Sequence, residues 1–389
     1  MNNQCKCFVQ YVLNDAPKHN KACVESAVAT RFSLTKDRKV YHNEYFAVRF
    51  SCSKSQTASF SNTVLSLSAL EKYDRIPFFV VLVRQCADNM ILLANSTLLK
   101  KVSHSSQELS MTNIKGSFNG SDIMRDVYGK ENVPSNFDFL FAVHQGLDWS
   151  DNLSRLVDAT SKIKSNAEKF SPDAIQVSAI LGSVVRSQLF VASSNFGVLK
   201  DDLDQRCQKC KNEILVASRI ENVNIRGRLI ESLITADDSE RQRIVQNLKD
   251  LENALPTYDT KNGLGDYCRV FESVNTLTDI KTKVVYLNSN PKAYNIDKFL
   301  RQMADGKSVF LFYFIGVDEQ GVFRTLLCSV YHGKLVENTI LQFHWAGRSS
   351  RGAAQFNGSA LDDMLHDPTF KNEIDVQKSE HFLRNLIER

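Results

Sequence analysis

The chain has 389 residues, 43% of them hydrophobic and 24% charged, with a formal net charge of +4. These values are ordinary for a soluble globular protein of two domains, and they exclude a fibrous or largely disordered chain. The mildly basic total permits nucleic-acid binding without arguing for it. No apolar run approaches bilayer-spanning length, and the first ten residues lack a secretory signal pattern, so we expect a cytoplasmic protein.

The nine cysteines are scattered through the chain. An odd number of cysteines in a chain without an export signal favours reduced thiols. Cys207 and Cys210 have the spacing of a metal knuckle, but a structural zinc ion needs four ligands and no second pair lies nearby. We therefore do not expect a zinc site.

The sequence pattern of residues 1–150 is typical of an α/β or mainly β domain. Runs rich in β-branched and aromatic residues predict strands at Tyr45–Phe50, Phe78–Arg84 and Met90–Ala94. Val64, Leu67 and Leu70 recur three residues apart, which favours a helix over Val64–Tyr73. We expect this domain to contribute DNA contacts, specificity or regulation.

Two Ser-rich segments follow the last of these strands. Lys100 and Lys101 lie in the first segment and Lys115 in the second, among short hydroxyl and amide side chains. Such mixtures suit contacts with DNA phosphates, where cations act together with small donors. The same composition is equally typical of soluble surface loops, so both interpretations stand.

Residues 151–389 begin with a helical region. Ser171-Pro172-Asp173 predicts a helix start, with Ser171 as the N-cap, and no Asp/Glu-x-Lys strand follows to make Asp173 catalytic. Amphipathic patterns then predict three further helices, at Leu199–Ala217, Ile225–Ile234 and Asp238–Ala254.

A predicted hairpin, Gly263 to Tyr286, organises the rest of the chain. Asp266 precedes a strand at Tyr267–Phe271, and Asp279 and Lys281 lie in a second strand at Leu277–Tyr286. Side chains two residues apart share a face of a strand, so Asp279 and Lys281 project together. Pairing of the two strands brings Asp266 close to Asp279.

Two carboxylates and a lysine at one place suit metal-assisted phosphodiester cleavage. Mg²⁺ prefers oxygen ligands and commonly binds one or two carboxylates, with waters and phosphate oxygens completing its shell. A nearby ammonium can orient the attacking water and offset negative charge. The alternative is a surface hairpin whose charges merely face solvent.

The arrangement resembles the PD-(D/E)xK nuclease superfamily and, within it, the type II restriction endonucleases. Asp266 and Asp279-Ile280-Lys281 match the motif, with Gly265 in place of the usual proline. The family places a Glu on the helix before the first strand, and Glu231 is the candidate, although a Glu at such a helix border is often only solvated or salt-bridged. The resemblance covers about Asn222 to Gln355 and implies a mixed sheet flanked by helices.

Downstream elements complete that pattern. A helix is predicted at Ile296–Met303, a strongly apolar strand at Ser308–Val317, and a returning strand at Phe323–Tyr331. Helix, two strands, helix and strand is the order expected of such a core.

Arg348 and Arg351 follow, set among Gly and Ser in a pattern that predicts a loop, and Gln355 comes shortly after them. Arg can pair with guanine and Gln with adenine in the major groove. Phosphate anchoring and internal ion pairing remain alternatives for the two arginines.

The resemblance implies a Mg²⁺-dependent enzyme that cleaves double-stranded DNA at specific sites. Asp266 and Asp279 would bind the metal, with the Ile280 carbonyl as a further candidate ligand, while Lys281 and Glu231 assist catalysis. A homodimer and a cognate DNA methyltransferase are expected partners. A modification-dependent or repair endonuclease with the same core, and a non-catalytic DNA-binding protein, remain alternatives. The sequence also leaves open whether Lys283 shares the role of Lys281.

Overall fold

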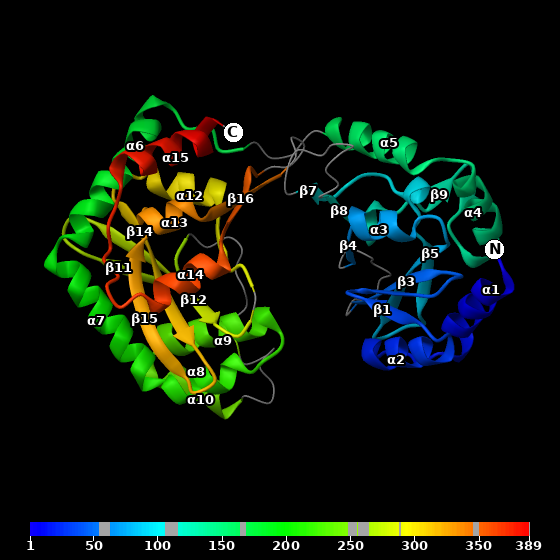
Figure 1. Ribbon diagram of the computed structural model, residues 1–389, viewed down its shortest axis with the longest axis horizontal. Helices are drawn as coiled ribbons and strands as arrows, with labels where there is room; N and C mark the ends of the chain where they lie inside the picture. The colour runs from blue at the N-terminus through cyan, green and yellow to red at the C-terminus, as the bar shows by residue number, and fades with distance from the viewer. Residues whose placement is uncertain are drawn as a thin grey trace. The chain divides into compact units, whose positions relative to one another are not determined.

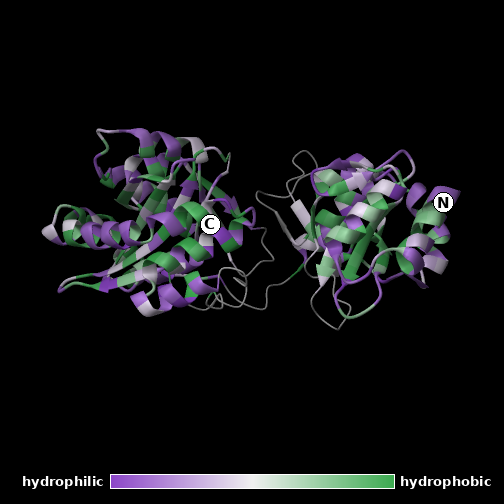
Figure 2. Cartoon of the chain, turned by 90° about the horizontal axis from the view of Figure 1, so that it is seen from below, coloured by the Kyte–Doolittle hydropathy of each residue, from purple (hydrophilic) through white to green (hydrophobic). Residues whose placement is uncertain are grey.

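The chain divides into two compact units, residues 1–167 with 343–349, and residues 168–342 with 350–389 (Figure 1). The computed structural model describes residues 1–53, 63–105, 116–163, 169–247, 255, 264–287, 289–344 and 350–388. In both units the hydrophobic residues concentrate on the inner strands and helix faces (Figure 2). The protein is mixed α/β, as the sequence predicted.

The N-terminal unit is built on a five-stranded sheet of order β1-β2-β3-β5-β6. Its neighbours pair antiparallel except β3 and β5, which are parallel. The strands are β1 (Thr35–Asp37), β2 (Val40–His42), β3 (Ala47–Ser53), β5 (Phe78–Arg84) and β6 (Met90–Leu93).

Helices cover both faces of this sheet because β5 is apolar on both sides. Phe79, Val81 and Val83 pack with α1 (Asn3–Gln10), α2 (Lys21–Arg31) and α4 (Phe137–Gln145). Phe78, Val80 and Leu82 pack with α3 (Leu67–Tyr73) and α5 (Trp149–Ser161). The result is an α/β/α sandwich, so the N-terminal unit is α/β rather than mainly β.

Short elements complete the N-terminal unit. The strands are β4 (Val64–Ser66), β7 (His104–Ser105), β8 (Gly116–Asn119), β9 (Asp126–Val127) and β10 (Lys130–Glu131). Single helical turns lie at Tyr11–Asp15, Ser96–Leu98, Gly120–Asp122 and Pro134–Asn136.

Two sequence expectations need correction in this unit. The helix predicted from Val64 begins at Leu67, because Ser66 caps it by accepting a hydrogen bond from Ala69 N and Val64–Ser66 pairs with β8. The boundary expected after residue 150 falls instead at residue 167. Leu153 and Leu156 of α5 are buried in the core of the N-terminal unit, which keeps this helix there.

The C-terminal unit is built on a four-stranded mixed sheet of order β11-β12-β14-β15. The strands are β11 (Tyr267–Val270), β12 (Asn275–Val284), β14 (Ser308–Val317) and β15 (Val322–Ser329). β12 and β14 run parallel, joined through α12 (Ile296–Met303), while the outer pairs are antiparallel. The predicted strand–strand–helix–strand order is therefore present.

The two faces of β14 form two cores. Val309, Leu311 and Tyr313 pack with helices that Figure 1 draws in green, namely α7 (Ser194–Lys209), α8 (Lys211–Ser218), α9 (Val223–Thr235) and α10 (Asp238–Gln246). On the opposite face, Phe310 and Phe312 contact aromatic rings of Tyr294, Phe299 and Phe356. Burial on both faces explains the nearly continuous apolar sequence of this strand.

The remaining elements lie around this sheet. A second, three-stranded sheet has the order β13-β17-β16, formed by β13 (Lys292–Asn295), β17 (Gly352–Phe356) and β16 (Thr339–Phe343). The other helices are α6 (Ala174–Val191), α13 (Gly333–Glu337), α14 (Gly358–His366) and α15 (Val376–Glu388).

Helix boundaries in this unit differ from the sequence expectations at three places. Asp173, not Ser171, caps α6, because its carboxylate accepts from Gln176 N and the Gln176 side chain accepts in return from Asp173 N. The single helix expected over Leu199–Ala217 is two helices with a break at Cys210. α10 ends at Gln246, and residues 248–254 lie outside the described part of the chain.

Contrary to the sequence expectation, α6 is long and apolar enough to cross a membrane by length and composition. It nevertheless packs within the folded unit. Ile180, Val184 and Phe190 are buried, and Arg186 in its middle donates a hydrogen bond of 2.9 Å to the Ser308 carbonyl. These contacts tie the helix to the C-terminal unit.

Candidate active site

Gly265 sets the position of the first candidate acid. Its φ is +87°, a backbone conformation that side chains disfavour, and a Cβ there would lie 3.1 Å from Leu277 Cα. The close approach lets Asp266 N donate to the Thr278 carbonyl at 2.8 Å and Asp266 Oδ2 accept from Ile280 N at 2.8 Å. Asp266 thereby extends the β11–β12 ladder and faces Asp279, as the hairpin predicted.

Asp279 and Lys281 project from the same face of β12. Oδ2 of Asp279 lies 2.6 Å from Nζ of Lys281. Asp279 is buried, and no donor meets that oxygen with hydrogen-bond geometry. Ile280, between them, points into the opposite core with Leu229 and Ile230 of α9.

Glu231 reaches this place from α9, which packs on β12. Burial raises the pKa of Glu231, the Asp266 carboxylate raises it further, and the ammonium of Lys281 opposes both. The charges of Asp266 and Lys281 both act on the Glu231 carboxyl, which places it in the same neighbourhood. The helix and the hairpin therefore bring together all four residues that the sequence singled out for catalysis.

The electrostatics of this cluster are dominated by three neighbouring carboxyl groups, of which Asp279 is buried. Burial raises the pKa of Asp279, which Lys281 lowers and Asp266 raises again. Burial lowers the pKa of Lys281, but the carboxylates of Asp279, Asp266 and Glu231 outweigh it, so the net shift is upward. Lys281 thus stays protonated, while three carboxyl groups share one ammonium.

Such a cluster has the chemistry of a divalent-cation site. Asp266 and Asp279 present carboxylate oxygens that share only the ammonium of Lys281, and a divalent ion would compensate the remaining negative charge. Within the described residues, no three His, Cys, Asp or Glu side chains form a complete metal-binding group. Mg²⁺ does not require one, because waters and substrate phosphates fill the rest of its shell.

Lys283 continues the face of β12 that carries Asp279 and Lys281, but its ammonium is engaged elsewhere. It donates to the Leu287 carbonyl at 2.8 Å and lies 3.1 Å from Asp362 Oδ2 of α14. The other oxygen of Asp362 is buried without a hydrogen-bond partner. No sequence motif pointed to Asp362, which is remote from the hairpin along the chain.

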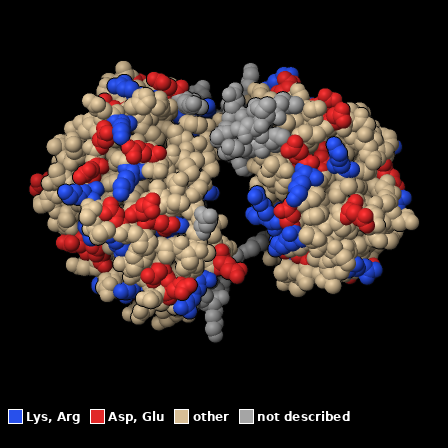
Figure 3. Space-filling view, in the orientation of Figure 1, with Lys and Arg blue, Asp and Glu red and all other residues tan. Residues whose placement is uncertain are grey.

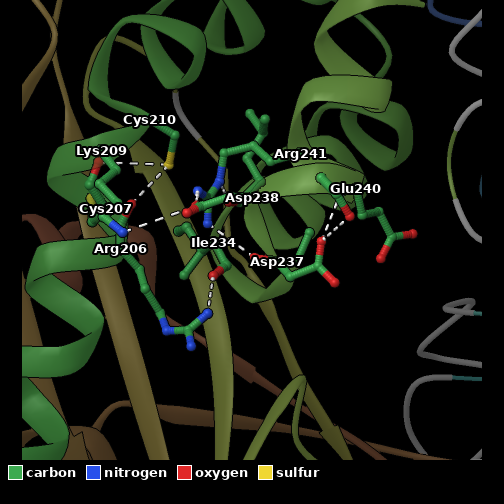
Figure 4. A network of polar contacts seen from close by, with 12 residues as sticks. Arg206, Cys207, Lys209, Cys210, Ile234, Asp237, Asp238, Glu240 and Arg241 are labelled. Carbon is green, nitrogen blue, oxygen red and sulfur yellow. Dashed lines mark hydrogen bonds and ion pairs between the residues drawn. The ribbon is translucent and has the colours of Figure 1, made fainter.

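A polar network anchors the edge strand that carries Asp266. Tyr267 donates to Asp202 of α7, and Arg206 and Arg269 form ion pairs with the same carboxylate at 3.1 and 3.5 Å. Arg206 also donates to the Ile234 carbonyl at the end of α9 (Figure 4). Asp202 thereby fixes β11 against the helices that present Glu231.

Cys207 and Cys210 lie beside this network rather than in a metal knuckle. Both thiols are buried, and Cys210 Sγ donates to the Arg206 carbonyl (Figure 4). Burial raises the pKa of Cys207 to about 12 and that of Cys210 to about 11. Protonated thiols are poor metal ligands.

The residues expected to contact DNA lie in different environments in the structure. Arg351 is buried, and its Nη1 donates to Asp297 Oδ1 at 2.5 Å, which is the internal ion pair left open by the sequence. Gln355 lies on β17, and its side chain accepts a hydrogen bond from the Gln342 side chain at 2.7 Å. Lys100 is exposed and Lys101 half-buried, in the N-terminal unit. Arg348 and Lys115 lie outside the described residues.

No family model matches the chain, and no curated protein matches it.

Replacing Gly265 by Ala tests the close approach at the mouth of the hairpin. We expect Gly265→Ala to lower the free energy of unfolding by about 2–3 kcal/mol, because positive φ and the contact with Leu277 both oppose a side chain. Gly306→Ala is the matched control, since Gly306 has φ +73° but open space around it. Equal losses in denaturant unfolding would show that the contact with Leu277 contributes nothing.

Replacing Arg351 by Met tests its internal role. The change leaves Asp297 buried without its cation, and we expect a loss of about 3–5 kcal/mol in denaturant unfolding. Arg384→Met, at an exposed position of α15, should change stability by less than about 0.5 kcal/mol. An Arg351 variant as stable as the parent would refute the structural role.

Proposed function

We propose that the protein is a Mg²⁺-dependent endonuclease of the PD-(D/E)xK type that cleaves double-stranded DNA at specific sites, as type II restriction enzymes do. One observation carries the proposal. Asp266, Asp279 and Glu231 converge on Lys281, so that three carboxyl groups share one ammonium around the buried Asp279. A solvated surface hairpin would not bury Asp279, because an isolated buried carboxylate is costly.

The proposed roles follow from the positions of the four side chains. Asp266 and Asp279, with the Ile280 carbonyl, would hold Mg²⁺. When bound, Mg²⁺ would lower the pKa of a coordinated water and neutralise charge on the phosphate. Lys281, kept protonated by its carboxylate neighbours, would orient the attacking water and stabilise negative charge developing on the phosphate. Glu231, with its raised pKa, would hold a proton or a water beside Asp266.

The fold supports this proposal through the order of its elements. α9, β11, β12, α12 and β14 follow one another as expected for such a nuclease core, and the β12–α12–β14 connection makes the two central strands parallel. The acids lie where the short edge strand β11 begins, and β12 extends further than β11 along the sheet. That part of β12 has no neighbouring strand on the β11 side among the described residues.

Several further features belong to the proposal. The enzyme would act as a homodimer, because two-fold protein symmetry matches a palindromic DNA site. A DNA methyltransferase would protect the host genome in the same cytoplasm. Lys100, Lys101 and Gln355 stay candidates for DNA contact, as do Arg348 and Lys115 by sequence; Arg351 is omitted because its guanidinium is held by Asp297.

Two other functions use the same features differently. A modification-dependent or repair endonuclease would share the catalytic cluster and cleave only methylated or damaged DNA. A non-catalytic DNA-binding protein would keep DNA affinity and cleave nothing with any divalent ion. The buried charge cluster favours either nuclease over the binding protein, because binding alone does not need it.

Amide substitution of the central acid tests catalysis. We expect Asp279→Asn and Lys281→Ala each to reduce Mg²⁺-dependent cleavage of plasmid DNA by at least about a hundredfold, since the first removes a carboxylate that would hold Mg²⁺ and the second an ammonium that would stabilise charge on the phosphate. Circular dichroism and DNA binding in Ca²⁺ would show whether the variants remain folded and bind DNA.

Asp363→Asn is the matched control for Asp279→Asn, because Asp363 is an exposed aspartate of α14 and should leave the rate unchanged. Cleavage by folded, DNA-bound Asp279→Asn at the rate of the parent would reject the proposed active site.

A further inference from the structure

The β1–β2 hairpin of the N-terminal unit has a tight turn with a non-glycine residue at positive φ, as the β9–β10 hairpin has at Tyr128. Asp37 pairs with Val40, so Arg38 and Lys39 alone connect the two strands. Two-residue hairpin turns place residues at positive φ, where Gly, Asn and Asp are favoured. Here the first turn residue is Arg38, with φ +53°. A bulky residue in this conformation is strained, and such strain concentrates at functional positions.

The hairpin also concentrates positive charge. Lys36, Arg38 and Lys39 are exposed, and none of them forms an ion pair among the described residues. The intervening Asp37 does not neutralise them, because it accepts hydrogen bonds from Lys72 Nζ and Tyr73 Oη, each at 2.6 Å. Figure 3 shows blue side chains gathered at the end of the unit where Figure 1 draws β1.

Local contacts hold the basic residues of the β1–β2 hairpin in place. Arg49 of β3 donates to the Lys39 carbonyl at 3.4 Å, and the Lys36 ammonium lies 5.4 Å from the centre of the Tyr41 ring. The cations are therefore presented on a fixed ribbon rather than on a loose loop. Rigid presentation reduces the conformational entropy lost on binding.

Protection of the sheet edge does not account for the whole pattern. β1 is an edge strand, and charged side chains such as Lys36 discourage pairing with other chains. Arg38 and Lys39 lie in the turn, where no ladder needs protection, and Arg38 occupies a conformation that Gly would adopt without strain. The turn cations therefore require a second explanation.

We infer that the β1–β2 hairpin, through Lys36, Arg38 and Lys39, is a nucleic-acid docking element that binds the phosphate backbone of duplex DNA. The inference rests on the proposed function for the identity of its partner. A two-stranded ribbon fits the width of the major groove, and cations on its tip would meet the flanking phosphates. Backbone contacts of this kind give register and affinity without sequence specificity.

Salt dependence of DNA binding tests this inference. The full-length protein would be titrated in Ca²⁺ against a fluorescein-labelled DNA duplex, over a series of KCl concentrations, and fluorescence anisotropy would give the dissociation constant. Each phosphate contact contributes about 0.9 to the slope of log K against log salt. We expect the triple variant Lys36→Gln, Arg38→Gly, Lys39→Gln to reduce that slope by roughly 2 to 3 and to weaken binding about tenfold or more near 0.1 M salt.

Arg38→Gly alone separates binding from folding. Gly adopts a positive φ without strain, so the melting temperature of the Arg38→Gly variant should equal or exceed that of the parent. The slope of log K against log salt for DNA binding should fall by about 1. Lys130→Gln is the matched control, since Lys130 is exposed on the other two-residue hairpin of the unit, β9–β10, and should leave both quantities unchanged.

The outcomes separate this inference from the proposed function. If the hairpin variants show a reduced salt slope for DNA binding and the parent cleaves no DNA, the hairpin inference would be supported and the proposed nuclease activity refuted. If the parent cleaves DNA and the triple variant shows an unchanged salt slope for DNA binding, the hairpin inference alone would be overturned. The same holds if the triple variant loses binding to phosphatidylserine vesicles but keeps its binding to DNA. A parent protein that binds no DNA would overturn both.

Discussion

Confinement of negative charge at the middle of β12 is the constraint on which this account depends. Asp266, Asp279 and Glu231 share a single ammonium, that of Lys281, and Asp279 among them is buried. Without a further cation, this arrangement raises the pKa of Asp279 and of Glu231, because burial and charge repulsion both oppose their ionisation. A divalent ion relieves the same conflict, which is why we interpret the cluster as a catalytic centre.

The fold creates this confinement through a few specific contacts. Gly265 allows the chain to approach Leu277 closely, and Asp266 then bonds across to Ile280. Asp202 holds the following strand by accepting from Tyr267, while the apolar face of α9 packs on the sheet and brings Glu231 to the same edge. The hydrophobic core thus supplies the burial energy that offsets the cost of gathering like charges.

The sequence predicted what depends on local periodicity and missed what depends on remote partners. Alternation along β12 predicted that Asp279 and Lys281 share a face, and apolar runs located β5 and β14 correctly. The partner of Arg351 is Asp297, far away in the chain, so its ion pair could be offered only as an alternative. Asp362 and the β1–β2 hairpin carry no sequence motif. The helix break at Cys210 has no Gly or Pro from which it could be predicted.

The central claim is that the cluster makes this protein a site-specific DNA endonuclease. The most direct measurement is incubation of the purified full chain with unmodified bacteriophage genomic DNA in Mg²⁺ and, separately, in EDTA, followed by sequencing of the fragment ends. We predict discrete fragments in Mg²⁺ that share one short sequence at their ends, and intact DNA in EDTA. Intact DNA in Mg²⁺, for unmodified and methylated substrates alike, would contradict the account and leave a DNA-binding protein as the better description.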